Sequence, residues 1–215
     1  MHPKRLAVLI PTCRPGVYLR RCLESLDNQS LETSRYHVYI ALNGDKEPYQ
    51  NFISELLKTV KFSHTLIVTD RRGVSNARNL LLSSSLEDFI TFIDDDDWVS
   101  KEYLLSLLDL ATDKSISVSN SMDFCDGPST LSPNFLSFAY AKISGIEECP
   151  FKFRRYLSPP WGKVFHRRMI GNYLFDVVLA KGEDSLFFAQ ISNRIHSAIK
   201  GPPEACYFVN RWLVS

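Results

Sequence analysis

The sequence predicts an α/β protein whose central sheet is mostly parallel and is flanked by helices. Two observations lead to this prediction. Along the first half of the chain, short apolar segments rich in β-branched residues alternate with segments whose apolar residues recur at helical spacing. The strand-like segments are apolar at nearly every position, as expected of parallel strands that are covered on both faces. Strands and helices that alternate in this way form doubly wound open sheets.

Four strands are expected in the first half, over residues 6–10, 38–42, 65–68 and 89–93. Each is followed by an apolar stripe of helical period, within residues 18–26, 52–60, 77–82 and 104–111. A short strand over 116–118 can follow the last of these helices. Beyond about residue 120 the periodicity weakens, and we expect a strand over 162–165, a helix over 184–191 and a last strand over 206–209.

Length and charge narrow the class of protein. A chain of 215 residues predicts one domain, spanning residues 1–215. With 25 Lys and Arg against 24 Asp and Glu, the net charge of +1 gives no field that would collect nucleic acid, so no nucleic-acid partner is expected. The apolar runs are too short for a transmembrane helix or the core of a signal peptide. Five scattered cysteines do not suggest a disulfide framework, and we expect a cytoplasmic protein.

Polar residues follow each of the four expected strands. In doubly wound sheets, ligands bind outside the carboxyl ends of the strands, so the segments after these strands should converge on one edge. They are residues 11–14, 43–45, 69–73 and 94–98.

The last of these segments contains Asp94, Asp95, Asp96 and Asp97. Adjacent carboxylates repel one another, and a cation among them offsets that cost. Mg²⁺ and Mn²⁺ prefer carboxylate oxygens, and Mg²⁺ commonly takes one or two from the protein and others from phosphates. The acidic run therefore predicts a divalent cation at this strand end. The alternative is a surface turn whose acids cap the helix that begins near residue 100.

Glu183 and Asp184 form a second acidic pair, just before an apolar helical segment. Acids at the start of a helix can be explained by the helix dipole alone. A carboxylate that faces a cavity can instead act as a general base, and both interpretations stay open at this point. Basic side chains that would suit a phosphate ligand lie near the same strand ends, at Arg14, Arg72 and Arg78.

Five motifs in order resemble those of the family 2 inverting glycosyltransferases. They are VLIPTCRP with YLRRCLESLDNQ (8–15 and 18–29), GVSNARN (73–79), FIDDDDW (92–98), WGKVF (161–165) and GED (182–184). The resemblance covers nearly the whole chain and implies a single Rossmann-like domain of the glycosyltransferase A fold. Residues 1–120, approximately, would bind the nucleotide-sugar, and residues 121–215 would form the acceptor side.

The resemblance also implies roles for residues near the nucleotide. Pro11, Thr12 and Arg14 would lie against the base and ribose. Asn43 stands where the family commonly carries an acid that reads the base, and an amide can both donate and accept a hydrogen bond. Arg72 and Arg78 would flank the nucleotide or its diphosphate.

For the acidic motif, the resemblance implies that Asp94 approaches the ribose and that Asp96 binds Mn²⁺ or Mg²⁺, with Asp95 between them. Four consecutive acids leave the register open by one residue, so Asp95 and Asp97 remain alternatives. Asp184 matches the family's catalytic base, and Glu183 is the second candidate. Trp161 and Lys163 would lie near the donor or acceptor sugar, and the alternative for Trp161 is a place in the core.

The expected function is therefore a metal-dependent inverting glycosyltransferase of hexosyl or N-acetylhexosaminyl type. Its donor would be a nucleoside diphosphate sugar, expected to be a UDP-sugar, and its acceptor a hydroxyl of a glycan or a lipid-linked sugar. By family analogy, the reaction would serve cell-surface polysaccharide synthesis in the cytoplasm, with peripheral association at the inner face of the membrane. The alternatives are an inactive relative that binds nucleotide or glycan, and an aspartate-based phosphotransferase, whose motif fits the acidic run poorly.

Overall fold

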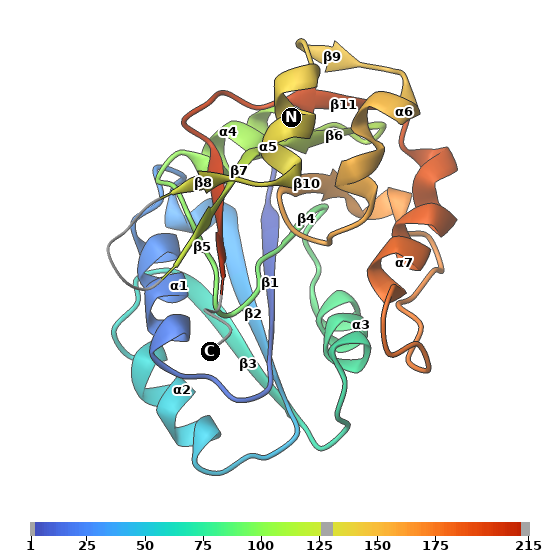
Figure 1. Cartoon of the computed structure of the whole chain (residues 1–215). Helices are drawn as coiled ribbons and strands as arrows, with labels where there is room; N and C mark the ends of the chain where they lie inside the picture. The colour runs from blue at the N-terminus through green and yellow to red at the C-terminus, as the bar shows by residue number, and fades with distance from the viewer. Residues whose placement is uncertain (1–2, 126–130, 212–215) are drawn as a thin grey trace.

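The first half of the chain folds as alternating strands and helices (Figure 1). The computed structural model describes residues 3–125 and 131–211. In order along the chain, the first elements are β1 (Leu6–Thr12), α1 (Val17–Asp27), the 3₁₀ helix η1 (Thr33–Arg35), β2 (Tyr36–Asn43), α2 (Tyr49–Leu57), β3 (Ser63–Thr69), α3 (Val74–Ser84) and β4 (Phe89–Phe92). All four expected strands and the first three expected helices are confirmed.

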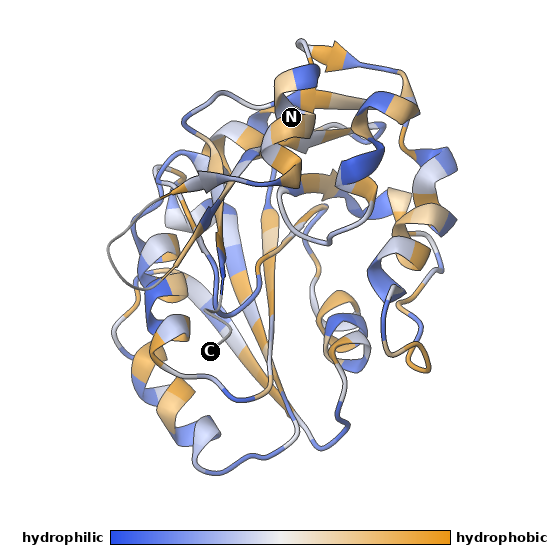
Figure 2. Cartoon of the chain, viewed as in Figure 1, coloured by the Kyte–Doolittle hydropathy of each residue, from blue (hydrophilic) through white to orange (hydrophobic). Residues whose placement is uncertain are grey.

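The central strands lie in the order β3, β2, β1, β4 and all run parallel. Every residue of β1 and β4 is buried, which explains why these segments are apolar on both faces. Helices α1 and α2 lie on one side of these strands and α3 on the other (Figure 1). Hydrophobic residues line β1, as Figure 2 shows. The carboxyl ends of the four strands therefore meet at one edge, as predicted.

The second half of the chain adds strands to the same sheet. Next to β4 lies β10 (Lys163–His166), which runs antiparallel to it, followed by β6 (Ser115–Val118), β11 (Ser197–Lys200) and β9 (Ile146–Glu147). The remaining helices are α4 (Tyr103–Leu110), α5 (Phe135–Lys142), α6 (Pro150–Phe153) and α7 (Glu183–Ile191), with the 3₁₀ helices η2 (Arg154–Leu157), η3 (Arg167–Met169) and η4 (Ser192–Arg194). The prediction of an α/β fold with a mostly parallel sheet is confirmed.

A second sheet, of four strands in the described part of the chain, was not expected from the sequence. Its order is β5 (Trp98–Val99), β12 (Cys206–Asn210), β7 (Asn120–Phe124) and β8 (Ser132–Pro133). The last expected strand therefore exists, but it pairs with β5 and β7 outside the main sheet. Trp98 stacks on Phe208 with ring centroids 3.7 Å apart. This pairing joins the end of the described chain to the segment that directly follows the four aspartates.

None of the helices built from residues 3–125 and 131–211 combines the length and the apolar character needed to cross a bilayer.

Candidate active site

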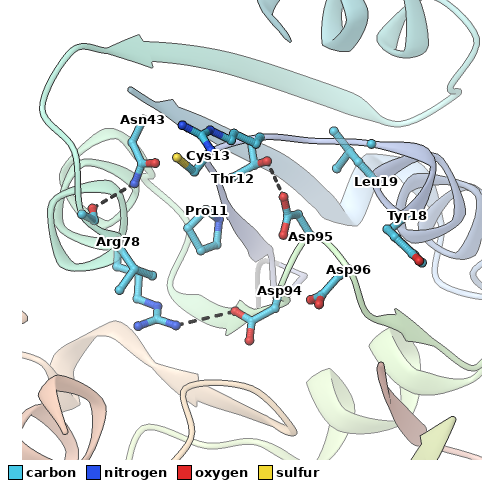
Figure 3. Close-up of a pocket in the computed structure, with 14 residues that line it drawn as sticks. Pro11, Thr12, Cys13, Tyr18, Leu19, Asn43, Arg78, Asp94, Asp95 and Asp96 are labelled. Carbon is cyan, nitrogen blue, oxygen red and sulfur yellow. Dashed lines mark hydrogen bonds and ion pairs between the residues drawn. The ribbon is translucent and has the colours of Figure 1, made fainter. Parts of the chain in front are cut away.

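A cavity of about 550 Å³ lies at the carboxyl ends of the parallel strands (Figure 3). Its walls come from the segments after β1, β2 and β4 and from the start of α3. The lining residues are Pro11, Thr12, Cys13, Arg14, Gly16, Tyr18, Leu19, Asn43, Gly73, Val74, Arg78, Asp94, Asp95 and Asp96. Most of the residues predicted to contact a nucleotide are thus brought together. Arg72, Glu183 and Asp184 are not among those that line it.

The first three aspartates of the acidic run face this cavity, and their environments differ. The carboxylate of Asp95 accepts a hydrogen bond from the hydroxyl of Thr12, which ties the acidic run to the end of β1. Burial raises the pKa of Asp95 to about 6, with the neighbouring carboxylates adding to the shift and the Thr12 hydrogen bond opposing it. Burial also raises the pKa of Asp94, although the guanidinium of Arg78 opposes that shift. Negative charge is therefore costly here until a cation approaches.

Asp97 has a different place, away from the cavity lining. Its side chain is 2% exposed, and Oδ1 accepts a hydrogen bond of 2.8 Å from the backbone N–H of Asn210 in β12. The hydroxyl of Tyr207 also hydrogen-bonds to Asp97, and it accepts a bond of 3.0 Å from the backbone N–H of Asp94. Asp97 thus anchors the turn after β4 to β12. The other three aspartates of the run, Asp94, Asp95 and Asp96, are the ones that line the cavity.

Arg78 lies between the cavity and the second acidic pair. Its Nη1 atom is 2.6 Å from Oδ1 of Asp184 and 3.3 Å from Oε1 of Glu183, and its Nη2 atom is 3.6 Å from Oδ1 of Asp94. The arginine is 4% exposed, and its guanidinium also lies over the ring of Phe175 at 5.4 Å. A buried cation that contacts three carboxylates fixes their relative positions. Arg78 also lines the cavity, so its expected place beside the nucleotide or its diphosphate stays a prediction.

Asp184 stands in the first turn of α7, directly after Gly182. Gly182 has a φ of 85°, a backbone conformation that residues other than glycine rarely adopt. This turn directs the start of α7 toward Arg78. Burial raises the pKa of Asp184 to about 6, and the nearby Arg78 limits the rise. A carboxyl group with a pKa close to the working pH of a cell is suited to accepting a proton. Its neighbour Glu183 contacts the same arginine at the longer distance.

Asn43 ends β2 on the cavity wall and is 3% exposed. Its Nδ2 atom donates a hydrogen bond of 2.9 Å to the carbonyl oxygen of Gly73, at the start of α3. Its Oδ1 atom has no hydrogen-bond partner among the described residues. A buried acceptor without a partner is costly, so a ligand with an N–H donor would be stabilised at this position.

Arg14 and Arg72 lie at the rim, where both side chains are 66% exposed and both approach Asp45. The distance from Arg72 Nη2 to Asp45 Oδ1 is 2.7 Å, and the distance from Arg14 Nη2 to Asp45 Oδ2 is 3.7 Å. Exposed pairs of this kind contribute little to stability, so either arginine can turn toward an anionic ligand at small cost.

Trp161 and Lys163 are both buried, and their expected place near a sugar stays a prediction. The Trp161 ring stacks on that of Tyr207 at 4.7 Å. Lys163 is fully buried, donates to the backbone carbonyl groups of Pro159 and Trp161, and lies 4.0 Å from the ring of Phe188. Burial holds the pKa of this lysine well below its usual range. Both residues therefore support the packing of α7 and β12 around the site.

Sequence reasoning missed two contributors to the site. Tyr207 holds the acidic run from more than a hundred positions away, and nothing in the local sequence indicates this contact. Asn79 exchanges two hydrogen bonds of 2.8 Å with the backbone of Phe175, which fixes the segment before α7. Asn79 belongs to the GVSNARN motif, which could have drawn attention to it.

Residues 7–170 match the model of a protein family described as glycosyl transferase family 2. The chain belongs to glycosyl transferase family 2. The match includes the cavity and the acidic run, and it ends before Glu183 and Asp184. The resemblance of the chain to this family is thereby confirmed.

Curated members of glycosyl transferase family 2 are similar to this chain at low identity. Glycosyltransferase GlyA of Streptococcus pneumoniae is 23% identical over 185 residues, which cover 80% of this chain and 26% of GlyA. The GalNAc(5)-diNAcBac-PP-undecaprenol beta-1,3-glucosyltransferase of Campylobacter jejuni is 22% identical over 200 residues, which cover 91% of this chain and 63% of that enzyme. This chain therefore spans less than two thirds of either relative.

Solved structures confirm the glycosyltransferase A fold. The crystal structure of residues 1–349 of Staphylococcus aureus TarS in complex with UDP-GlcNAc matches with a TM-score of 0.80 at 17% identity. The match covers 98% of this chain and 60% of the TarS chain. A mannosyltransferase from Pyrobaculum calidifontis, solved with GDP-Man and Mn²⁺, matches with a TM-score of 0.68 at 15% identity, over 97% of this chain and 57% of that chain.

The acids after β4 fit a divalent cation by their chemistry. Within the described residues, no group of three or more His, Cys, Asp or Glu side chains is arranged to hold a metal ion. A cation that also binds nucleotide phosphates needs only one or two protein carboxylates. Asp94 and Asp96 supply hard oxygen donors to one cavity, which is the donor set that Mg²⁺ and Mn²⁺ prefer.

Proposed function

We propose that this chain carries the donor-binding and catalytic residues of an inverting glycosyltransferase that uses a nucleoside diphosphate sugar. The observation that carries the proposal is the pair of contacts made by Arg78, to Asp94 from the cavity and to Asp184 from α7. An acid suited to the nucleotide and an acid suited to proton transfer thus lie on either side of one side chain. This arrangement suits an inverting reaction, in which the leaving group and the attacking oxygen occupy opposite faces of the sugar.

The proposed nucleotide is a uridine diphosphate. The amide nitrogen of Asn43 is already used by Gly73, so the remaining polar atom of this side chain is an acceptor. Uracil presents an N–H donor at its ring edge and would satisfy that acceptor, whereas the corresponding ring nitrogens of cytosine and adenine are acceptors. Guanine also carries a ring N–H, and GDP is therefore a competing nucleotide. The amino groups of cytosine and adenine are donors as well, so CDP and ADP belong in the same comparison. Pro11, Thr12 and Arg14 would complete the contacts to base and ribose.

In the proposed reaction, Asp184 accepts the proton of an acceptor hydroxyl while that oxygen forms a bond to the anomeric carbon. The bond from the anomeric carbon to the diphosphate oxygen breaks at the same time, and its electron pair leaves with the nucleoside diphosphate. Asp96, with Asp94 and Asp95 beside it, would hold Mn²⁺ or Mg²⁺, which when bound supplies positive charge to the leaving diphosphate. Arg78 holds the base in position, and Glu183 assists through the same contact.

The proposed acceptor is a hydroxyl of a glycan or of a lipid-linked sugar. The relatives include an enzyme named for an undecaprenol-linked glycan and one named for poly(ribitol-phosphate). We extend this to synthesis of a cell-surface polysaccharide in the cytoplasm. The transferred group is a hexose or an N-acetylhexosamine, as the names of these relatives allow.

We also propose that residues 1–215 act as one domain, with the nucleotide half and the acceptor half sharing a sheet. The support is the position of β10 directly beside β4, and of β12 directly beside β5. The candidate base and the cavity acids belong to different halves, so the reaction requires both.

Two measurements test the proposed function. In the first, the melting temperature is followed with UDP, GDP, CDP and ADP, each with and without Mn²⁺. At about a hundred times the dissociation constant, a ligand stabilises the folded state by about 2.7 kcal/mol, so the preferred nucleotide gives the largest shift. In the second, release of nucleoside diphosphate is followed with a UDP-sugar. An inactive relative would bind without release, and an aspartate-based phosphotransferase would release inorganic phosphate instead.

A further inference from the structure

The segment between η3 and α7 exposes an unusual amount of apolar surface. Residues 173–179, which we call the apolar loop, include five large apolar side chains that face solvent. Val178 is 88% exposed, Leu174 58% and Val177 56%, with Leu179 and Tyr173 at 42% and 40%. In Figure 2 the hydrophobic colour gathers at the tip of this loop, beside α7. Contiguous exposed apolar surface on a soluble domain usually marks a site of interaction.

The apolar loop is held in a defined shape. Phe175 is 2% exposed and stacks on Phe187 of α7 with ring centroids 4.0 Å apart. Asn79 bonds to both the N–H and the carbonyl group of Phe175. At the tip, Oδ1 of Asp176 accepts hydrogen bonds of 2.7 Å and 3.1 Å from the backbone N–H groups of the two residues that follow Val177. The apolar side chains therefore point outward from a supported turn.

Basic residues flank this apolar surface. Residues 150–181 contain seven Lys and Arg but a single acid, although the whole chain has a net charge of only +1. That acid is Asp176, whose carboxylate is used within the loop. Lys181 is exposed at the end of the loop. The side chain of Arg168, which precedes the loop, is 79% exposed and forms a long surface ion pair, with 3.9 Å between its Nη1 atom and Oδ2 of Asp113. The guanidinium of Arg194 lies 5.4 Å from the centre of the Tyr173 ring.

The order of these groups matches the layers of a bilayer surface. Aliphatic side chains form the tip, an amphipathic tyrosine stands behind them, and lysine and arginine lie at the base. Such an order suits insertion of the tip at the boundary of the acyl chains while the cations meet anionic headgroups. A protein partner would be expected to offer acids to these cations, and the loop alone is small for a stable protein interface.

We propose that the apolar loop and its basic flank, Arg168, Lys181 and Arg194, dock this chain on the surface of an anionic lipid bilayer. The role of this docking in catalysis rests on the proposed function, in which Asp184 is the base. The apolar loop leads through Gly182 directly to Asp184. Docking there would bring the base close to the bilayer surface, where the hydroxyl of a lipid-linked acceptor is found.

The test is sedimentation of the full chain with vesicles, in parallel with the nucleotide melting measurement. The vesicles are phosphatidylcholine alone or phosphatidylcholine with about 30% phosphatidylglycerol, a typical anionic surface. The key variant is Val178→Asp, and the matched control is Leu86→Asp, because Leu86 is 86% exposed in the turn before β4, at the opposite end of the parallel strands. Both positions are exposed, so neither substitution should disturb folding.

We expect the wild type to bind the anionic vesicles and to lose binding at high salt. Val178→Asp should weaken that binding about tenfold or more, since it removes aliphatic surface and adds a negative charge. Leu86→Asp should bind as the wild type does, and Lys181→Glu should reduce the preference for the anionic lipid. Wild-type protein that stays in the supernatant, or a Val178→Asp variant that binds equally well, would overturn the proposal.

Two further outcomes separate this proposal from others. If Val178→Asp converts an oligomer into a monomer in light scattering without changing vesicle binding, the apolar loop is an interface between copies and the bilayer proposal is wrong. If no nucleotide raises the melting temperature while the vesicle results hold, the proposed function fails and the docking surface stands. Val178→Asp should leave the nucleotide response unchanged, since residue 178 does not line the donor cavity.

Discussion

The Nη1 atom of Arg78 lies 2.6 Å from Oδ1 of Asp184, although the two residues are 106 positions apart in the chain. Arg78 lines the cavity at the strand ends, and Asp184 lies in the first turn of α7. The same guanidinium also approaches Asp94. A change in charge at Asp94 therefore alters the electrostatic environment of the candidate base, Asp184. The site is therefore a single electrostatic unit rather than two neighbouring ones.

Replacement of Asp184 by Asn should lower kcat by about 10²–10⁴-fold, because the amide cannot take the proton of the acceptor. Most of the melting shift produced by UDP and Mn²⁺ should be kept, since residue 184 does not line the cavity and contacts it only through Arg78. Glu183→Gln serves as the matched control and should retain most of the turnover. If Asp184→Asn keeps wild-type turnover, or if Glu183→Gln loses more turnover than Asp184→Asn, the base is Glu183 and the assignment to Asp184 is wrong.

The activity should depend on the ionisation of Asp184. Burial raises the pKa of Asp184 to about 6, and the base form is the ionised one. The rate should therefore rise with pH, by about tenfold per unit below pH 6, and level off above pH 7. The pH profile of kcat/KM under metal-saturated conditions checks this. In Asp184→Asn, the residual rate should no longer rise with pH below pH 6. A wild-type profile that is flat between pH 5 and 7 would contradict the assignment.

Asp96→Ala should abolish the part of the nucleotide response that requires Mn²⁺. The proposed cation contacts both this carboxylate and the diphosphate, so its loss removes a stabilisation of about 2–3 kcal/mol under near-saturating ligand. Titration of Mn²⁺ at fixed UDP, followed by melting temperature, measures the effect. Asp70→Ala is a suitable control, because that acid is 81% exposed and pairs only at the surface with Lys46. Equal Mn²⁺ responses in both variants would shift the metal to another acid of the run.

Asp97 should prove to be a structural residue. Asp97→Ala leaves the buried N–H of Asn210 without its acceptor and should lower the free energy of unfolding by about 1–3 kcal/mol. Asp97→Asn keeps an oxygen in that position and should lose less. Urea unfolding measures both values. If the two variants instead fold like the wild type and have lost only their Mn²⁺ response, the acidic run is used in a different register.

Asn43→Ala should weaken UDP binding about tenfold, because the hydrogen bond to the base is lost. Its counterpart is Asn51→Ala, at an exposed position of α2, which should bind UDP normally. Calorimetry with UDP and GDP compares the two nucleotides directly. Unchanged UDP affinity in Asn43→Ala would show that the base is read elsewhere in the cavity.

The parallel part of the fold could be predicted from the sequence because its signals are local. β1 and β4 are continuous apolar runs, and α1 carries a regular stripe that includes Leu19 and Leu26, so period and burial agree. The convergence of strand ends then follows from geometry alone. For this reason the cavity wall formed by Thr12, Asn43 and the acidic run was accessible to sequence reasoning.

The second sheet and the true partners of Arg78 were not accessible in the same way. β5 and β8 have two residues each, too few to give a periodic signal, and their pairing depends on contacts between distant segments. The burial of Trp161 and Lys163 could not be read from their motif, because a motif does not report which way a side chain faces. The burial of Lys163 is possible only because two carbonyl groups and the ring of Phe188 surround its ammonium.

The strand β12 carries a consequence for any attempt to divide this molecule. Tyr207 and Asn210 supply hydrogen bonds that keep the turn after β4 in shape, so a truncated fragment that stops near residue 120 would lack them. Such a fragment would still possess every aspartate of the motif, yet it should bind nucleotide poorly. A chimera that takes its second half from a homologous enzyme should be impaired in the same way. The strand that replaces β12 would also have to form hydrogen bonds with Asp94 and Asp97.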